Sequence, residues 1–174
     1  MVRYVKNKNQ VVSRRTKDAY LYEKRFVKLC RRKKLVIQKT DLFVMYLINP
    51  NYIGRKRVKW GELELIEGAI KRVRLMKALM ALLLKHGWGY TKYYNEDDDE
   101  DDFKVGTYGL PDFIILTASS KKPFWVEVKS GSAKMKPKQI LMKNMLEEIG
   151  FKVFLYRGGR ISSLIDMADQ RYSG

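Results

Sequence analysis

Cysteine is nearly absent from this 174-residue chain, and no long uninterrupted apolar run occurs in it. The single Cys30 excludes a disulfide framework, and no histidine lies near it in sequence, which argues against a catalytic thiol. The most apolar run, residues 75–84, contains Lys77 and is too short to span a bilayer. With no export signal or internal repeat visible, we expect a cytoplasmic protein that has no membrane partner.

Acidic residues are scarce in the first third of the chain. Residues 1–60 contain eighteen Lys and Arg against three acidic residues, a net charge of +15, whereas residues 61–174 carry only +2. An excess of one sign suits a polyanion, because cations that neutralise phosphates release counterions. We therefore predict a basic, helical, DNA-contacting extension over residues 1–60 and a separate core over residues 61–174. The candidate DNA contacts are Arg14, Arg15, Lys24, Arg25, Arg31 and Arg32, with Lys134 and Lys136 in the core.

The chain also contains one run of acidic residues, in contrast to its excess of positive charge. Residues 96–102 are seven consecutive Asp and Glu residues, which repel one another and are typical of a solvated loop. The alternative is a flap that competes with DNA for the basic surface or supplies an additional metal carboxylate.

A hairpin is the most informative pattern in the core. Residues 113–116 and 124–129 are apolar, β-branched or aromatic runs, and the turn-like residues 117–123 separate them. Side chains alternate along a strand, so Glu127 and Lys129 share a face that is opposite to Val126 and Val128. If the hairpin folds about Ser120, Asp112 lies beside this Glu–Lys pair. Two carboxylates and one ammonium group therefore converge.

This set of groups suits phosphoryl transfer. Mg²⁺ prefers one or two carboxylates together with water and phosphate oxygens, so we expect Asp112, Glu127 and the backbone carbonyl of Val128 to hold it, with Mn²⁺ as a substitute. Lys129 would orient the attacking water or stabilise charge on the phosphate. The alternative is an ordinary solvated sheet face that carries no chemistry.

The flanking pattern predicts an α-β-β-β-α-β order. A long helix is expected over residues 63–85, followed by a strand over residues 88–94 and by the hairpin. After the hairpin, residues 140–149 have helical spacing, with Pro137 before them and Gly150 after them, and residues 151–156 alternate as a strand. A strand, a helix and a strand in succession form a crossover, so the last strand should run parallel to the Glu127 strand.

Over about residues 62–160 the chain resembles the PD-(D/E)xK nuclease superfamily, most closely its virus-type replication-repair nuclease branch and the archaeal Holliday-junction resolvases. The resemblance implies a restriction-endonuclease-like αβββαβ core with a mixed four-stranded sheet. It further implies that Asp112 and Glu127 are metal carboxylates, that Lys129 is the catalytic lysine and that Gln139 is the glutamine of the replication-repair branch.

The resemblance also implies a glutamate from the first core helix, and three residues are candidates. We place Glu67 ahead of Glu64 and Glu62. The function expected is that of a Mg²⁺-dependent DNA endonuclease, with selectivity for DNA structure as one expectation; a non-catalytic nucleic-acid-binding protein that keeps the fold is the alternative. A resolvase would need two sites, which makes a homodimer one expectation.

Overall fold

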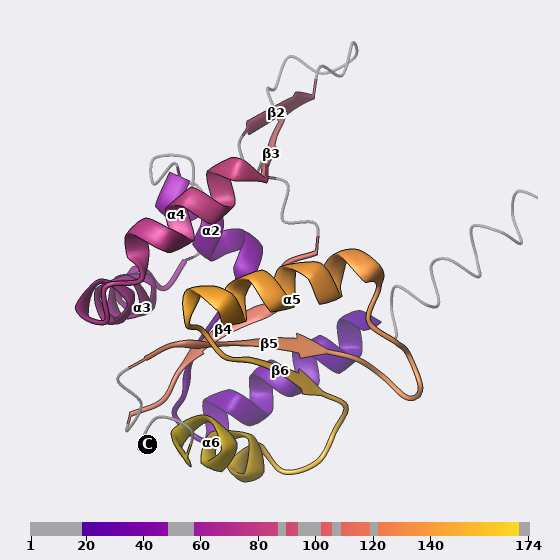
Figure 1. Cartoon of the computed structure of the whole chain (residues 1–174). Coiled ribbons are helices and arrows are strands. Elements are labelled where there is room, and N and C mark those ends of the chain that lie inside the picture. Colours follow the sequence, from indigo (N-terminus) through magenta and orange to yellow (C-terminus); the bar gives the residue numbers. More distant parts are fainter. Residues whose placement is uncertain are drawn as a thin grey trace, which may run out of the picture.

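A four-stranded mixed sheet organises the chain (Figure 1). The computed structural model describes residues 19–48, 58–86, 90–93, 102–105, 109–118 and 122–170. The strands follow the order β1 (Val36–Lys39), β4 (Phe113–Leu116), β5 (Phe124–Val128) and β6 (Val153–Tyr156). Three adjacent strands are antiparallel, and β6 runs parallel to β5. The predicted mixed four-stranded sheet and α/β class are confirmed, and they are consistent with a restriction-endonuclease-like fold.

The hairpin forms in the predicted place. β4 and β5 are antiparallel, and Phe113 pairs with Val126. The side chains of Phe124, Val126 and Val128 face one hydrophobic cluster, whereas Trp125 belongs to the cluster on the other side of the sheet. The predicted alternation is therefore confirmed, and it assigns Glu127 to the same face as Trp125.

The crossover that follows is also confirmed. Helix α5 (Pro137–Ile149) begins with Pro137 in its first turn, where a missing N–H costs no hydrogen bond. It ends at Gly150, whose φ of 122° lies in the region that favours glycine. The chain then enters β6, and α6 (Ile161–Gln170) completes the described part of the chain.

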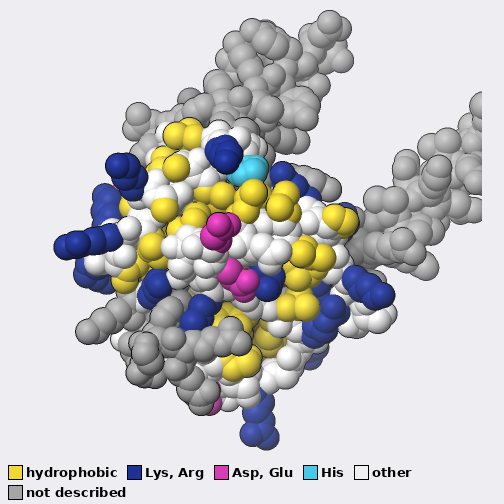
Figure 2. Space-filling view, viewed as in Figure 1, with side chains coloured by type: hydrophobic (Ala, Val, Ile, Leu, Met, Phe, Trp, Pro, Cys, Tyr) yellow, Lys and Arg dark blue, Asp and Glu magenta, His cyan; other side chains and the backbone are white. Residues whose placement is uncertain are grey.

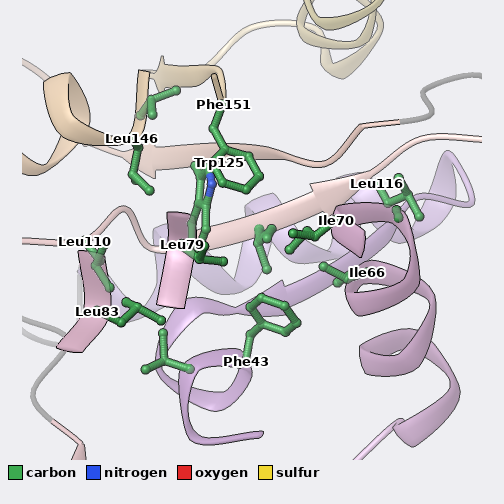
Figure 3. Packing of buried hydrophobic residues seen from close by; sticks show 14 of the residues in the cluster. Phe43, Ile66, Ile70, Leu79, Leu83, Leu110, Leu116, Trp125, Leu146 and Phe151 are labelled. Carbon is green, nitrogen blue, oxygen red and sulfur yellow. The ribbon is translucent and has the colours of Figure 1, made fainter. Parts of the chain in front are cut away.

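Helices cover both faces of the sheet. The helix over residues 19–32 and α6 lie on one face, where Phe26, Phe113, Phe124 and Leu164 are buried together. The other face is covered by α5 and by three more helices, α2 (Thr40–Ile48), α3 (Trp60–Arg72) and α4 (Met76–Lys85). Figure 3 shows this second cluster, in which the Trp125 indole meets the Phe151 ring edge-on at a centroid distance of 5.8 Å.

The first core helix and first core strand differ from the prediction. β1 is the edge strand of the main sheet, with Val36 opposite Leu116, and the helix over residues 19–32 precedes it. Phe26 and Cys30 of that helix are completely buried in the core. The boundary predicted at residue 60 therefore does not separate an extension from a core, because residues 19–48 are part of the sheet and its packing.

The prediction of a single helix over residues 63–85 was wrong. It is broken at Val73–Leu75, where Arg74 has a left-handed φ of 60°. In a continuous helix of 3.6 residues per turn, Leu63 and Leu79 would lie about 160° apart around the axis. The break lets Leu63 and Leu79 enter the same hydrophobic cluster.

The strand predicted over residues 88–94 exists, but its assignment to the main sheet was wrong. β2 (Tyr90–Tyr93) pairs antiparallel with β3 (Asp102–Val105) in a separate two-stranded sheet. Residues 96–101 of the acidic run lie outside the described residues. No helix in the described ranges combines the length and the apolar character needed to cross a membrane.

Candidate active site

Asp112 and Glu127 meet where the hairpin strands end. Asp112 directly precedes Phe113, the partner of Val126, so the antiparallel register sets it opposite Glu127. The Val128 amide donates a 2.8 Å hydrogen bond to Asp112 Oδ2. The backbone of Asp112 is held as well, since its carbonyl accepts a 3.0 Å bond from the Thr40 amide at the end of β1. Two neighbouring strands therefore fix the position of this carboxylate.

The turn before Asp112 requires glycine. Gly109 has a φ of 91°, and a Cβ at this position would lie 2.6 Å from Lys138 Cγ and 3.0 Å from the Lys138 carbonyl oxygen. The chain therefore passes close against α5 before it reaches Asp112. Thr40 also donates its hydroxyl to the carbonyl of Pro111, which holds the other side of the turn.

Glu127 is a buried acid whose two carboxylate oxygens have different environments. Its residue is only 2% exposed. Oε1 lies 3.0 Å from Lys129 Nζ and accepts a 2.8 Å hydrogen bond from Gln139 Nε2. Oε2 is equally buried and has no hydrogen-bond partner among the described residues. A buried carboxylate oxygen without a donor is costly unless a cation or a proton satisfies it.

Gln139 links this acid to the start of α5. Its Oε1 accepts a 2.8 Å hydrogen bond from the Lys136 amide at the helix N-cap, while its Nε2 donates to Glu127. The amide can be satisfied in this way in only one orientation, so the helix terminus fixes the side chain, and the side chain fixes one carboxylate oxygen.

Burial governs the charge of both acids. It raises the pKa of Asp112, an effect that the Val128 amide and the nearby Lys129 partly oppose. Burial and the neighbouring Asp112 charge raise the pKa of Glu127 to about 7, although Lys129 acts in the opposite direction. Two acids with raised pKa values side by side are typical of a functional site, and an added cation would restore their charged forms.

A third acid, which the sequence analysis did not include among the site residues, acts on this pair through its charge. Glu23 lies on the helix over residues 19–32, with Oε2 3.9 Å from Lys39 Nζ at the end of β1. Lys39 pairs with Phe113, next to Asp112. Burial raises the pKa of Glu23, and the charge of Asp112 raises it further. Glu23 and Lys39 thus flank the carboxylate pair on the β1 side.

Two of the three glutamates of α3 have other partners, and the third is exposed. Glu62 binds Arg31 at 2.6 Å and accepts a 2.7 Å hydrogen bond from Gln38. Glu67 forms a 2.6 Å ion pair with Lys71 and accepts a hydrogen bond from the Tyr46 hydroxyl, and Glu64 is exposed. No contact in the described structure brings these glutamates to Asp112 or Glu127. Glu23 was missed although a helix was expected in its segment, because the pairing of β1 with β4 has no local signal in the sequence.

The predicted DNA-contacting residues occupy different settings. Arg31 is engaged by Glu62 and by the Ile37 carbonyl, whereas Lys24, Arg25 and Arg32 are exposed along the same helix. Lys134 and Lys136 are exposed in the loop between β5 and α5, close to the site in sequence. Arg14 and Arg15 lie outside the described residues. Figure 2 shows Lys and Arg spread around the rim of the α5 face, with few acidic side chains.

The donor set fits a hard divalent cation. Asp112 and Glu127 supply carboxylate oxygens, and the partnerless Glu127 Oε2 is the atom that a cation would satisfy. Within the described residues no three His, Cys, Asp or Glu side chains lie close enough together to enclose an ion. The candidate centre is therefore a carboxylate pair, and water or phosphate oxygens would supply the remaining ligands of an ion held there.

Comparison with known proteins identifies the family of this chain. The VRR-NUC domain family matches residues 56–159, a range that contains Asp112, Glu127, Lys129 and Gln139 and begins after Glu23 and β1. No curated protein and no solved structure matches the chain. Since the match covers more than half of the sequence and includes the carboxylate pair with its lysine, the chain belongs to the VRR-NUC family of the PD-(D/E)xK nuclease superfamily.

Proposed function

We propose that this protein is a metal-dependent DNA nuclease that hydrolyses phosphodiester bonds within a strand, with Mg²⁺ as its ion and Mn²⁺ as a substitute. The observation that best supports this function is the state of Glu127. Its carboxylate is buried beside Asp112, one oxygen is held by Lys129 and Gln139, and the other oxygen has no partner in the described structure.

Asp112 and Glu127 are the residues that would hold the ion, and the charge of Glu23, which acts on Asp112, would contribute beside them. When bound, a divalent ion would act as a Lewis acid toward a phosphate oxygen and would lower the pKa of a water molecule. The protein's own contribution is to present the carboxylates in a fixed orientation. The Val128 amide orients Asp112, and Gln139 orients Glu127.

Lys129 is the group best placed to act on the reacting atoms. Its ammonium group lies 3.0 Å from Glu127 Oε1 and is largely shielded from solvent. A fixed cation at this point stabilises negative charge that develops on the phosphate, or orients the water that attacks it. Lys39, on the other side of the acids, is more exposed and suits a contact with a neighbouring phosphate.

The experiment that tests this function is cleavage of supercoiled plasmid, linear duplex and labelled branched DNA, with Mg²⁺, with Mn²⁺ and with EDTA. Wild type should cut only with metal, and Asp112→Asn and Glu127→Gln should not cut. Both variants should keep their DNA affinity, because neither acid is a cationic contact. Isothermal titration with Mn²⁺ should show binding to wild type and its loss in Glu127→Gln. Metal-independent cutting, or wild-type activity in both variants, would contradict the proposal.

A further inference from the structure

A groove of about 800 Å³ runs along the outer side of the helix over residues 19–32. Among the described residues that line it, only Ser130 belongs to another element, the loop after β5. The remaining side chains are of two kinds. Four are exposed cations, namely Lys24, Arg25, Lys28 and Arg32, and three are apolar or aromatic, namely Leu21, Tyr22 and Leu29.

Helical geometry explains why the cations form a row. Lys24, Lys28 and Arg32 are spaced by four residues, so they lie above one another on one side of the helix. No acidic side chain occurs among the described lining residues. Arg31, one position away, points instead to Glu62. No acidic side chain of the described lining therefore neutralises these cations, and the row can bind successive phosphates.

Three of the side chains that line the groove are apolar or aromatic. Leu21 is 60% exposed although it is a large hydrophobic side chain. The Tyr22 hydroxyl donates a 2.7 Å hydrogen bond to the Arg157 carbonyl, which anchors its ring at the groove wall. A duplex exposes its phosphates, which a cationic surface can bind, but its base faces are stacked inside. It would therefore make few contacts with the apolar side chains of the groove. Unpaired bases expose faces that pack against apolar and aromatic side chains.

A second, smaller hollow of about 230 Å³ adjoins the groove. It shares Tyr22, Arg25 and Leu29 with the groove and is closed by Tyr156 and Gly158 at the end of β6. A Cβ on Gly158 would lie 3.1 Å from Tyr22 Oη, so the backbone approaches the ring closely. An aromatic and glycine-walled hollow beside a row of cations has the composition of a base-binding site.

Two residues of the groove adjoin residues of the candidate active site in the sequence. Lys24 directly follows Glu23, and Ser130 directly follows Lys129.

We propose, on the basis of the nuclease function above, that this groove binds an unpaired segment of the DNA strand that passes through the active site. The four cations contact its phosphates, and Leu21, Tyr22 and Leu29 contact its bases. The protein then selects substrates in which a single-stranded segment adjoins the scissile bond.

The first test measures affinity by fluorescence anisotropy with EDTA present, so that no cleavage occurs. The probes are a labelled oligothymidylate of about 16 nucleotides, within the range of known single-strand sites, and a blunt duplex of equal length. Lys24→Ala/Lys28→Ala should bind the oligothymidylate about tenfold more weakly, with a salt slope smaller by about 1.4. Lys77→Ala/Lys85→Ala is the control, because it removes the same charge from exposed positions on α4. Equal affinities of the two double variants would overturn the proposal.

The second test examines whether the apolar side chains of the groove contact bases. Leu21→Ser should weaken oligothymidylate binding about fivefold, within the range for loss of one base contact, and leave duplex binding unchanged. Leu84→Ser is its control, since Leu84 is similarly exposed, at 64%, on α4. No loss for Leu21→Ser, or an equal loss on the duplex, would contradict an unpaired strand.

These outcomes are distinguishable from failure of the nuclease function. A protein that passes both binding tests but never cuts DNA would refute the proposed function and leave the groove assignment intact. A protein that cuts with metal but whose groove variants bind like their controls would refute the groove assignment alone.

Discussion

Gln139 and Glu127 meet at 2.8 Å, and this hydrogen bond joins the first turn of α5 to the buried acid of β5. It leaves the second oxygen of Glu127 as the atom without a partner in the described structure. Several consequences of this arrangement, and of its surroundings, are measurable.

Gln139→Ala should lower metal affinity and cleavage by about 10–100-fold, because the loss of a group that orients a metal ligand typically has this cost. Raising the Mn²⁺ concentration should restore part of the activity, which would not happen if the variant were merely unstable. Asn144→Ala is the control, an exposed amide on the same helix. The measurement is cleavage rate against Mn²⁺ concentration for the three proteins, and identical curves would show that Gln139 does not orient Glu127.

Glu23→Gln should lower cleavage by roughly a hundredfold, as does the loss of a group that acts at the reacting centre. Glu67→Gln should leave cleavage near wild type and reduce stability by about 1 kcal/mol, because Glu67 binds Lys71 and Tyr46 instead. Cleavage assays and urea denaturation on both variants check this contrast. The reverse pattern would assign the third acid to α3, which lies inside the region matched by the family.

Glu127→Gln should stabilise the metal-free protein at alkaline pH. The pKa of Glu127 is raised by burial and Asp112 from 4.5 to about 7. Between these values the folded chain holds more protons at this group than the unfolded chain, so its contribution to stability falls as pH rises. Thermal unfolding in EDTA at pH 4.5, 6 and 8 should show the advantage of the variant growing with pH. A constant difference would mean that Glu127 has an ordinary pKa.

Arg31→Ala should destabilise the fold by about 1–3 kcal/mol, because it leaves Glu62 half-buried without its closest partner. Its effect on DNA affinity should be small, in contrast to Lys24→Ala/Lys28→Ala. Urea denaturation and anisotropy on the same samples separate the two effects. If Arg31→Ala has the stability of wild type but binds DNA poorly, Arg31 contacts DNA and this prediction is wrong.

The hairpin, its acids and the crossover could be predicted from the sequence because their signals are local. Asp112, Glu127 and Lys129 lie within 18 residues, so strand alternation and a turn were enough to bring them together. Pro137 and Gly150 marked the ends of α5 in the same way.

Glu23 and β1 were missed because their signals are not local. β1 has only four residues, two of them polar, and its partner strand begins at Phe113. Propensity and periodicity over a short window contain no information about such a distant pairing. The break between α3 and α4 was more accessible, since Leu63 and Leu79 cannot share a face of one continuous helix.

The pairing of β1 with β4 also bears on how the protein folds. Val36 is opposite Leu116, 80 positions later, so the sheet closes a loop of that length before Glu23 can approach Asp112. Pairings between residues so far apart form late, because the loss of chain entropy precedes the gain from contacts. During synthesis the hairpin and its acids can fold only after most of the chain has been made. We therefore expect Glu23 to reach Asp112 only at a late step of folding.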